Sequence, residues 1–173
     1  IGRARFNNVS QSQVRLLFLG WLERNKGVIE LLQVCARLSS THAFSLVIAG
    51  RGNAETEARE LVESEGLSDR ISFRGWVQGA ELDQLFSDSN VLVLPSWSEG
   101  LPNVMIEAMA AGLAVVVSSV GNVPDLMTDG EEALLVPPKD VKTLAKALGR
   151  VIHDEELRQA LARKGHRFAE ENF

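Results

Sequence analysis

Short apolar runs alternate with segments of helical periodicity along nearly the whole chain, and this alternation restricts the fold more than any other feature. The runs cover residues 14–19, 44–49, 71–73, 91–94, 114–117 and 133–136. Helical patterns cover residues 28–38, 54–65, 80–87, 141–153 and 155–171 and the segment between Pro102 and Gly112. Strands alternating with helices form βαβ units with right-handed crossovers. We therefore predict an α/β fold with a doubly wound, Rossmann-like parallel sheet.

Two glutamates flank the start of one apolar helical segment, eight residues apart. Pro102 suits the first turn of this helix, because its missing N–H would be unpaired there, and Gly112 suits its end. The segment has almost no polar face, so we expect it to be buried on most sides, with Glu107 paired or hydrogen-bonded. Glu99 precedes the helix, where free N–H groups and the helix dipole favour anions. The alternatives are a solvated or salt-bridged Glu107 and a simple loop or cap role for Glu99.

The composition argues against several other classes of protein. The 173 residues suffice for one domain with a core, and the net charge of −5 argues against a nucleic-acid surface. No apolar run approaches the roughly 20 residues that span a bilayer. The single Cys35 excludes an internal disulfide and suits a reducing, cytoplasmic compartment, where we expect it to be a small core residue. No Cys/His cluster has metal-ligand spacing, so we expect no metal site.

Glycine-rich and polar residues follow four of the predicted strands. A doubly wound sheet binds its ligands outside the carboxyl ends of its strands, so these residues are candidates for a site. They are Gly20, Trp21 and Lys26 after the first strand, Gly50, Arg51 and Gly52 after the second, Gly75, Trp76 and Val77 after the third, and residues 96–102 after the fourth.

Together these residues resemble the C-terminal, donor-binding domain of a family 4 glycosyltransferase of the GT-B fold, from about residue 6 to residue 173. Glu99 and Glu107 match the Glu-x7-Glu motif of that family, and residues 121–125, 129–130 and 134–138 fit its downstream pattern. Lys26 and Gly27 fit the end of its phosphate-clamp segment. The resemblance implies a retaining, hexosyltransferase-type reaction from a nucleoside-diphosphate sugar to an acceptor sugar or lipid-linked glycan, with no cofactor and no metal.

The resemblance also implies roles for individual residues. Glu107 would hold the ribose hydroxyls, and Lys26 and Glu99 would act in catalysis, on the leaving diphosphate and on the hydroxyls of the transferred sugar. Backbone N–H groups and a lysine can stabilise the charge that develops on the diphosphate. The other donor-binding residues implied are Gly20, Trp21, Gly50, Arg51, Gly75, Trp76, Val77, Gly100, Leu101, Pro102, Asn103 and Val104.

One position departs from the family pattern. Trp21 stands where family members usually carry an arginine that pairs with the lysine on the diphosphate, and one neutral indole N–H cannot replace a guanidinium. Arg24 or Arg51 could supply the charge, or each could be a solvated surface residue. The departure keeps a second hypothesis open, in which the chain is a non-catalytic nucleotide-sugar binding module. A nicotinamide-binding domain is disfavoured, because Gly50-x-Gly52 follows the second strand and lacks the third glycine.

The domain organisation follows from the same resemblance. Residues 1–12 are polar and aperiodic, and we expect them to be the remnant of an interdomain linker ahead of a donor-binding domain at residues 13–173. The N-terminal acceptor domain of such enzymes has no counterpart in this sequence. We therefore expect the isolated chain to be inactive, with the acceptor, and any peripheral membrane contact, bound through the missing half.

Overall fold

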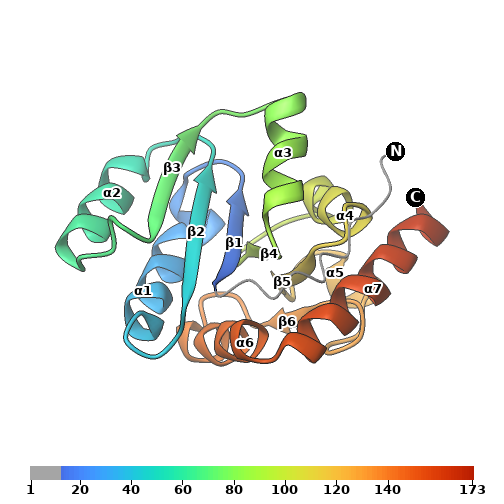
Figure 1. Ribbon diagram of the computed structural model, residues 1–173. Coiled ribbons are helices and arrows are strands. Elements are labelled where there is room, and N and C mark those ends of the chain that lie inside the picture. The colour runs from blue at the N-terminus through green and yellow to red at the C-terminus, as the bar shows by residue number, and fades with distance from the viewer. Residues whose placement is uncertain (1–12) are drawn as a thin grey trace.

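A parallel sheet of six strands runs through the computed structural model, which describes residues 13–173 (Figure 1). The strands are β1 (Val14–Leu19), β2 (Phe44–Ala49), β3 (Ile71–Gly75), β4 (Val91–Leu94), β5 (Ala114–Ser118) and β6 (Leu134–Val136). They lie in the order β3-β2-β1-β4-β5-β6, and every neighbouring pair is parallel. The predicted doubly wound sheet is confirmed, while the linker predicted at residues 1–12 lies outside the described residues.

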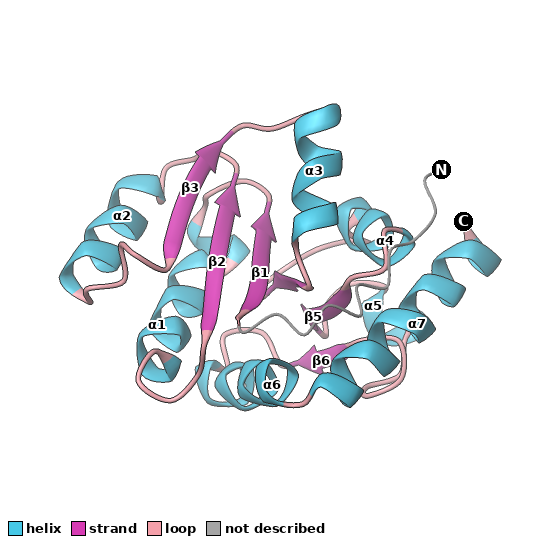
Figure 2. Ribbon diagram, viewed as in Figure 1, coloured by secondary structure: helices cyan, strands magenta, loops and turns pink. Residues whose placement is uncertain are grey.

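Helices connect the strands (Figure 2). They are α1 (Val28–Leu38), α2 (Glu55–Ser64), α3 (Ala80–Asp88), α4 (Asn103–Ala110), α5 (Val123–Leu126), α6 (Val141–His153) and α7 (Glu155–Asn172), with a 3-10 turn η1 (Arg24–Lys26). The sequence predicted every strand and all the longer helices within two residues at each end. It did not predict η1 or α5, because single turns of three or four residues carry no periodicity that a pattern could reveal.

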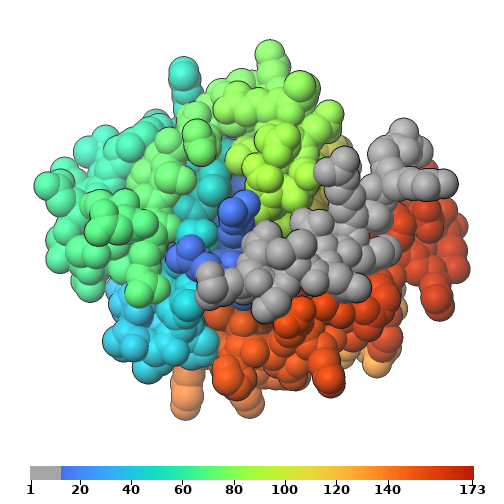
Figure 3. All heavy atoms as spheres, viewed as in Figure 1, coloured from blue at the N-terminus to red at the C-terminus, as the bar shows by residue number. Residues whose placement is uncertain are grey.

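Successive strand residues face opposite layers, and both layers are buried. Leu16 and Phe18 of β1 pack with α1, α2 and α6, whereas Leu17 packs with α3 and α4 on the other face. The long helix α7 contributes to both layers, and Figure 3 shows it in red at one corner of the molecule. Cys35 lies in the core as predicted, and burial raises the pKa of its thiol to about 12, so it carries no reactive thiolate at neutral pH.

Helix α4 differs from its prediction in two respects. Pro102 is the residue before the helix, with φ −67° and ψ 113°, and not part of its first turn. The helix is buried on the side of Met105 and Met109, but Glu107 is exposed. The sequence composition suggested burial on most sides, yet the helix packs on β4, β5 and α7 and leaves its remaining face open. None of the described helices combines the length and apolar character needed to span a membrane.

Candidate functional site

A cavity of about 700 Å³ opens at the carboxyl ends of β1, β2 and β4. The strand order reverses between β1 and β4, and this is where doubly wound sheets bind ligands. All but three of the residues assigned to catalysis or donor binding line it: Gly20, Trp21, Lys26, Gly50, Trp76, Val77, Glu99, Leu101, Pro102, Asn103, Val104 and Glu107. The topology thus brings together four loops that lie far apart in the sequence.

The three exceptions are Arg51, Gly75 and Gly100, which do not line the cavity. Gly75 is the last residue of β3, and its carbonyl accepts a hydrogen bond from the N–H of Gly50 at 2.7 Å. Arg51 is exposed, and its Nε would lie 3.6 Å from a Cβ atom built on Gly75. The carbonyl of Gly100 accepts from the N–H of Asn122 at 3.1 Å. Gly75 and Gly100 therefore hold the loops around the cavity in place through backbone hydrogen bonds.

Several lining residues were given no role from the sequence. Ser96 and Gln78 are polar, and the apolar surface is completed by Phe18, Leu19, Ala49, Leu82 and Leu94. Ser96 is buried two residues after β4, within the segment 96–102 that the sequence did mark as a candidate. Its position three residues before Glu99 was the available signal, but only the curvature of the loop brings the two side chains together. Leu82 comes from α3, whose approach to the strand ends no local pattern reveals.

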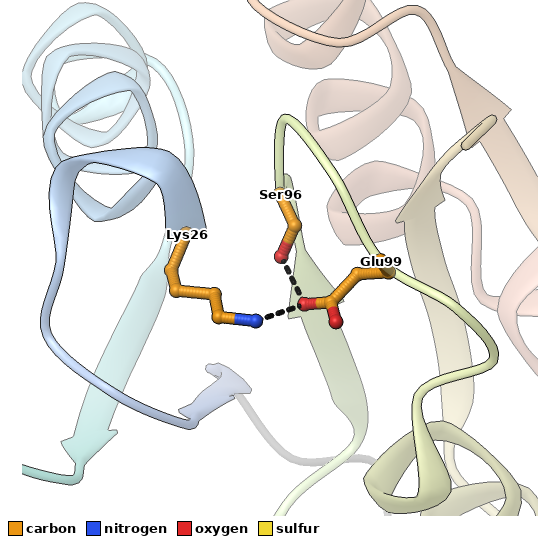
Figure 4. Close-up of polar contacts among 3 residues, drawn as sticks. All are labelled: Lys26, Ser96 and Glu99. Atoms are coloured by element: carbon orange, nitrogen blue, oxygen red, sulfur yellow. Dashed lines mark hydrogen bonds and ion pairs between the residues drawn. The ribbon is translucent and has the colours of Figure 1, made fainter. Parts of the chain in front are cut away.

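Lys26 and Glu99, which both line the cavity, form an ion pair with each other (Figure 4). Nζ of Lys26 lies 2.7 Å from Oε1 of Glu99, and the hydroxyl of Ser96 donates to the same oxygen at 2.8 Å. The two charged side chains retain only 23% and 19% of their exposure, so solvent screens the pair less than a surface ion pair. The two groups that the sequence assigned to diphosphate and sugar therefore neutralise one another in the free chain.

Close backbone packing fixes the loops that carry this pair. Gly27 has φ 72°, and a Cβ there would lie 2.0 Å from the carbonyl oxygen of Pro95. The loop after β5 packs equally closely, since a Cβ on Gly121 would lie 2.1 Å from the carbonyl oxygen of Glu99. Any side chain at these two glycines would force the loops apart.

Glu107 lies on the side of the cavity formed by α4, and its carboxylate makes no hydrogen bond or ion pair within residues 13–173. The expectation that it would be paired is therefore wrong for the free chain, because its exposure lets water solvate the charge. The start of α4 has no side-chain cap, so its first N–H groups are free to meet a ligand. The charged residues that line the cavity are Lys26, Glu99 and Glu107, whose charges sum to +1 − 2 = −1.

Two tryptophans form an apolar wall beside these charged groups. Trp21 and Trp76 contact each other with ring centroids 5.4 Å apart and an interplanar angle of 44°. They are 54% and 55% exposed, which is unusual for residues of this size. Arg24 does not line the cavity, and its guanidinium instead pairs with Glu57 at 2.7 Å on the outer surface. Neither arginine that could compensate for Trp21 therefore lines the cavity of the free chain.

Residues 13–173 contain no group of three or more His, Cys, Asp or Glu side chains arranged to hold a metal ion. The charged and polar groups that can contact a ligand at this cavity include the ammonium, the two carboxylates, the hydroxyl of Ser96, the amides of Gln78 and Asn103 and the free N–H groups at the start of α4.

Comparisons with known proteins show the family to which the chain belongs. A family model described as "Glycosyl transferases group 1" matches residues 3–168. The chain belongs to this family of glycosyltransferases. Its sheet is one Rossmann-like half of the GT-B fold, as the sequence predicted.

Individual relatives are longer than the chain. An undecaprenol-linked glycan α-1,4-N-acetyl-D-galactosaminyltransferase of Campylobacter jejuni is 33% identical over 159 residues, which cover 90% of this chain and 43% of that protein. The sucrose-phosphate synthase of Thermosynechococcus elongatus superposes with a TM-score of 0.82 at 30% identity, covering 94% and 42%. Anabaena HepE, crystallised with UDP, superposes with a TM-score of 0.83 at 22% identity, covering 93% and 45%. The chain spans less than half the length of the curated relatives that it matches.

Proposed function

We propose that this chain is the donor-binding domain of a retaining, family 4 glycosyltransferase that moves a hexose from a nucleoside-diphosphate sugar to an acceptor. The acceptor, a sugar or a lipid-linked glycan, binds through an N-terminal domain of the longer protein. The observation that carries the proposal is the meeting of Lys26, Glu99, Glu107 and the uncapped start of α4 around one cavity at the strand-order reversal. An anionic ligand that also carries hydroxyls can use all of these groups.

Each group has a proposed role in the transfer. Departure of the diphosphate leaves negative charge on its oxygens, and Lys26 and the N–H groups near Val104 stabilise that charge. Glu107 accepts hydrogen bonds from the ribose hydroxyls, since its carboxylate is exposed to the cavity and has no partner within residues 13–173. Glu99 accepts from hydroxyls of the transferred sugar through the oxygen that Lys26 and Ser96 leave available. Trp76 and Val77 border the nucleobase.

A second candidate function is a non-catalytic nucleotide-sugar binding module. Two observations favour it: Trp21 replaces the expected arginine, and Glu99 neutralises Lys26, so the cavity lining carries a net charge of −1. Such a site should bind a diphosphate less tightly than a site in which an arginine and a lysine both contact the phosphates. Turnover of a nucleotide sugar by the longer protein supports the enzyme, whereas binding without turnover supports the module. The isolated chain should show no transfer in either case, because positioning of the acceptor contributes much of the rate.

A thermal-shift panel of UDP, GDP and ADP and their hexose esters tests donor binding on the chain itself. A ligand at a hundredfold excess over its Kd stabilises the folded state by about 2.7 kcal/mol. For a domain of this size, that corresponds to a rise in Tm of about 5–10 °C. We expect at least one nucleotide and its sugar ester to produce this rise. The absence of any shift at millimolar ligand would contradict the donor-site proposal.

Two variants make the panel specific to the cavity. Glu107→Gln should reduce the shift to about half, as expected for roughly tenfold weaker binding at the same ligand concentration. The Tm of the free protein should stay unchanged, since the side chain is exposed and has no partner within residues 13–173. Glu60→Gln changes an equally exposed glutamate on α2, away from the cavity, and should keep the full shift. Equal shifts in both variants would mean that the ligand binds elsewhere.

A further inference from the structure

Trp97 contacts three different segments behind the Lys26–Glu99 pair. Its backbone N–H donates to the carbonyl of Asn25 at 2.8 Å, and Asn25 directly precedes Lys26. Its indole N–H donates to Oε1 of Glu30 on α1 at 3.2 Å. The ammonium of Lys139, from the loop between β6 and α6, lies 4.2 Å from the centroid of the indole ring. Trp97 thus links the loop of Lys26 to its own loop, which carries Glu99 two residues later.

Glu30 is an energetically unfavourable residue for a purely structural contact with Trp97. Its second oxygen, Oε2, is buried and has no hydrogen-bond partner among the described residues. Glu30, Ser118 and Lys139 border a cavity of about 10 Å³, separate from the large cavity. The hydroxyl of Ser118 likewise has no hydrogen-bond partner among the described residues. A neutral apolar residue would avoid burying a carboxylate oxygen, so the charge at position 30 calls for an explanation.

Lys139 is also held in an unusual conformation. It has φ 64°, the one left-handed residue other than glycine within residues 13–173. A lysine in this region of φ is strained, and such strain persists only where surrounding contacts hold it. In this conformation the ammonium lies over the face of the Trp97 ring, where a cation is attracted by the ring quadrupole. The Trp97 indole is therefore held through its N–H edge and through its ring face.

We propose that Trp97 is a positioning residue for the site, held by Glu30 and Lys139. It fixes the two loops so that Nζ of Lys26 and Oε1 of Glu99 stay within 2.7 Å of each other. None of Trp97, Glu30 and Lys139 lines the large cavity, so their action on a ligand is indirect. The effect on the ion pair is independent of any ligand, whereas an effect on donor binding rests on the proposed function.

The coupling between Lys26 and Glu99 provides the test. A double-mutant cycle of Lys26→Met and Glu99→Gln, read from urea midpoints, measures how strongly the two side chains interact. The cycle is run in the native background and in the Trp97→Phe, Glu30→Ala and Glu30→Gln backgrounds. Trp97→Phe keeps a ring under Lys139 but removes the N–H, and Glu30→Gln keeps an oxygen that can accept it. We expect the coupling to fall by more than half in Trp97→Phe and Glu30→Ala and to persist in Glu30→Gln.

A second ion pair serves as the internal control. Arg24 lies in the same turn as Lys26, but it pairs with Glu57 on the outer surface. A cycle of Arg24→Met and Glu57→Gln should give the same coupling in all four backgrounds. If the Lys26–Glu99 coupling survives in both Trp97→Phe and Glu30→Ala, the positioning role is wrong. If both couplings fall together, the variants loosen the whole fold and the proposal fails as well.

Binding of UDP and UDP-glucose adds a functional readout. Glu99 is assigned to the sugar, so displacing it should weaken the binding of UDP-glucose and leave the binding of UDP almost unchanged. In Trp97→Phe we expect the ratio of the Kd for UDP to the Kd for UDP-glucose to fall about fivefold. A uniform loss for both ligands would contradict positioning of Glu99. Failure of the native chain to bind either probe would count against a UDP donor in the proposed function, while the coupling test would still decide the role of Trp97.

Discussion

Two groups of residues that line the large cavity differ in their contacts. In the first group, Lys26, Ser96 and Glu99 satisfy each other through hydrogen bonds of 2.7 and 2.8 Å and are largely shielded from solvent. In the second group, Trp21 and Trp76 are more than half exposed, and the carboxylate of Glu107 has no partner within residues 13–173. We call the first group the paired end of the site and the second group its open end.

The difference shows how one site can be ordered in the free chain and still offer unpaired groups to a ligand. Groups at the paired end are held in place before a ligand arrives, which limits the ordering that binding requires. They must also give up or share an existing interaction, because a diphosphate competes with Glu99 for the ammonium of Lys26. Groups at the open end lose only water when a ligand binds. Substitutions at the two ends should therefore differ in size and, in one case, in sign.

Lys26→Ala should have the largest effect on ligand binding. It removes the one cation that lines the described cavity and leaves Glu99 to repel the diphosphate. A charge-assisted hydrogen bond contributes about 1.5–3 kcal/mol, so we expect roughly ten- to hundredfold weaker binding of nucleotide and nucleotide sugar. Calorimetry measures the loss, and Lys142→Ala, at an exposed position on α6, is the matched control. Unchanged affinity in Lys26→Ala would remove Lys26 from the site.

Glu107→Gln should have the next largest effect, at the open end. It removes a carboxylate that the ribose hydroxyls would use, so nucleotide and nucleotide sugar should weaken alike, by about tenfold. The stability of the free protein should not fall, because the exposed charge has no partner within residues 13–173. Calorimetry with both ligands decides the assignment. A loss confined to the sugar ester would move Glu107 from the ribose to the transferred sugar.

Glu99→Gln should produce effects of opposite sign for the two ligands. The sugar ester loses a charged acceptor and should bind about fivefold more weakly. The plain nucleotide should bind equally well or a few-fold more tightly, because Lys26 no longer has a carboxylate 2.7 Å away. The same calorimetric pair of titrations measures both. Equal weakening of the two ligands would show that the paired end does not distinguish sugar from diphosphate.

Arg24→Ala should have the smallest effect, less than twofold in affinity. The arginine is 68% exposed and pairs with Glu57 outside the cavity, and surface pairs contribute about 0–1 kcal/mol. This variant tests whether Arg24 takes the role of the arginine that family members usually carry at the position of Trp21. A tenfold loss of nucleotide affinity would mean that the side chain leaves Glu57 to reach the diphosphate, and it would extend the paired end to a second cation.

The sheet could be predicted from the sequence because the pattern that marks each strand lies within the strand itself. Strands β1, β2, β4, β5 and β6 are short and mostly apolar, and burial of both faces of a parallel sheet requires such runs. Position 99 was identified for the same reason, since it precedes an apolar helix. The exposure of Glu107 could not be predicted in this way. The face of α4 that stays open depends on where β5 and α7 pack, and those elements lie outside the segment.

The amino-acid sequence by itself determined the βαβ order, the placement of the candidate residues at strand ends and the family to which the chain belongs. Tertiary structure alone decided that Lys26 and Glu99, 73 residues apart, are partners and that Trp97 braces them. Local propensities depend on neighbouring residues, whereas an ion pair depends on how loops after different strands approach each other. That approach is set by contacts such as Gly27 against Pro95, which exist only once the sheet has assembled.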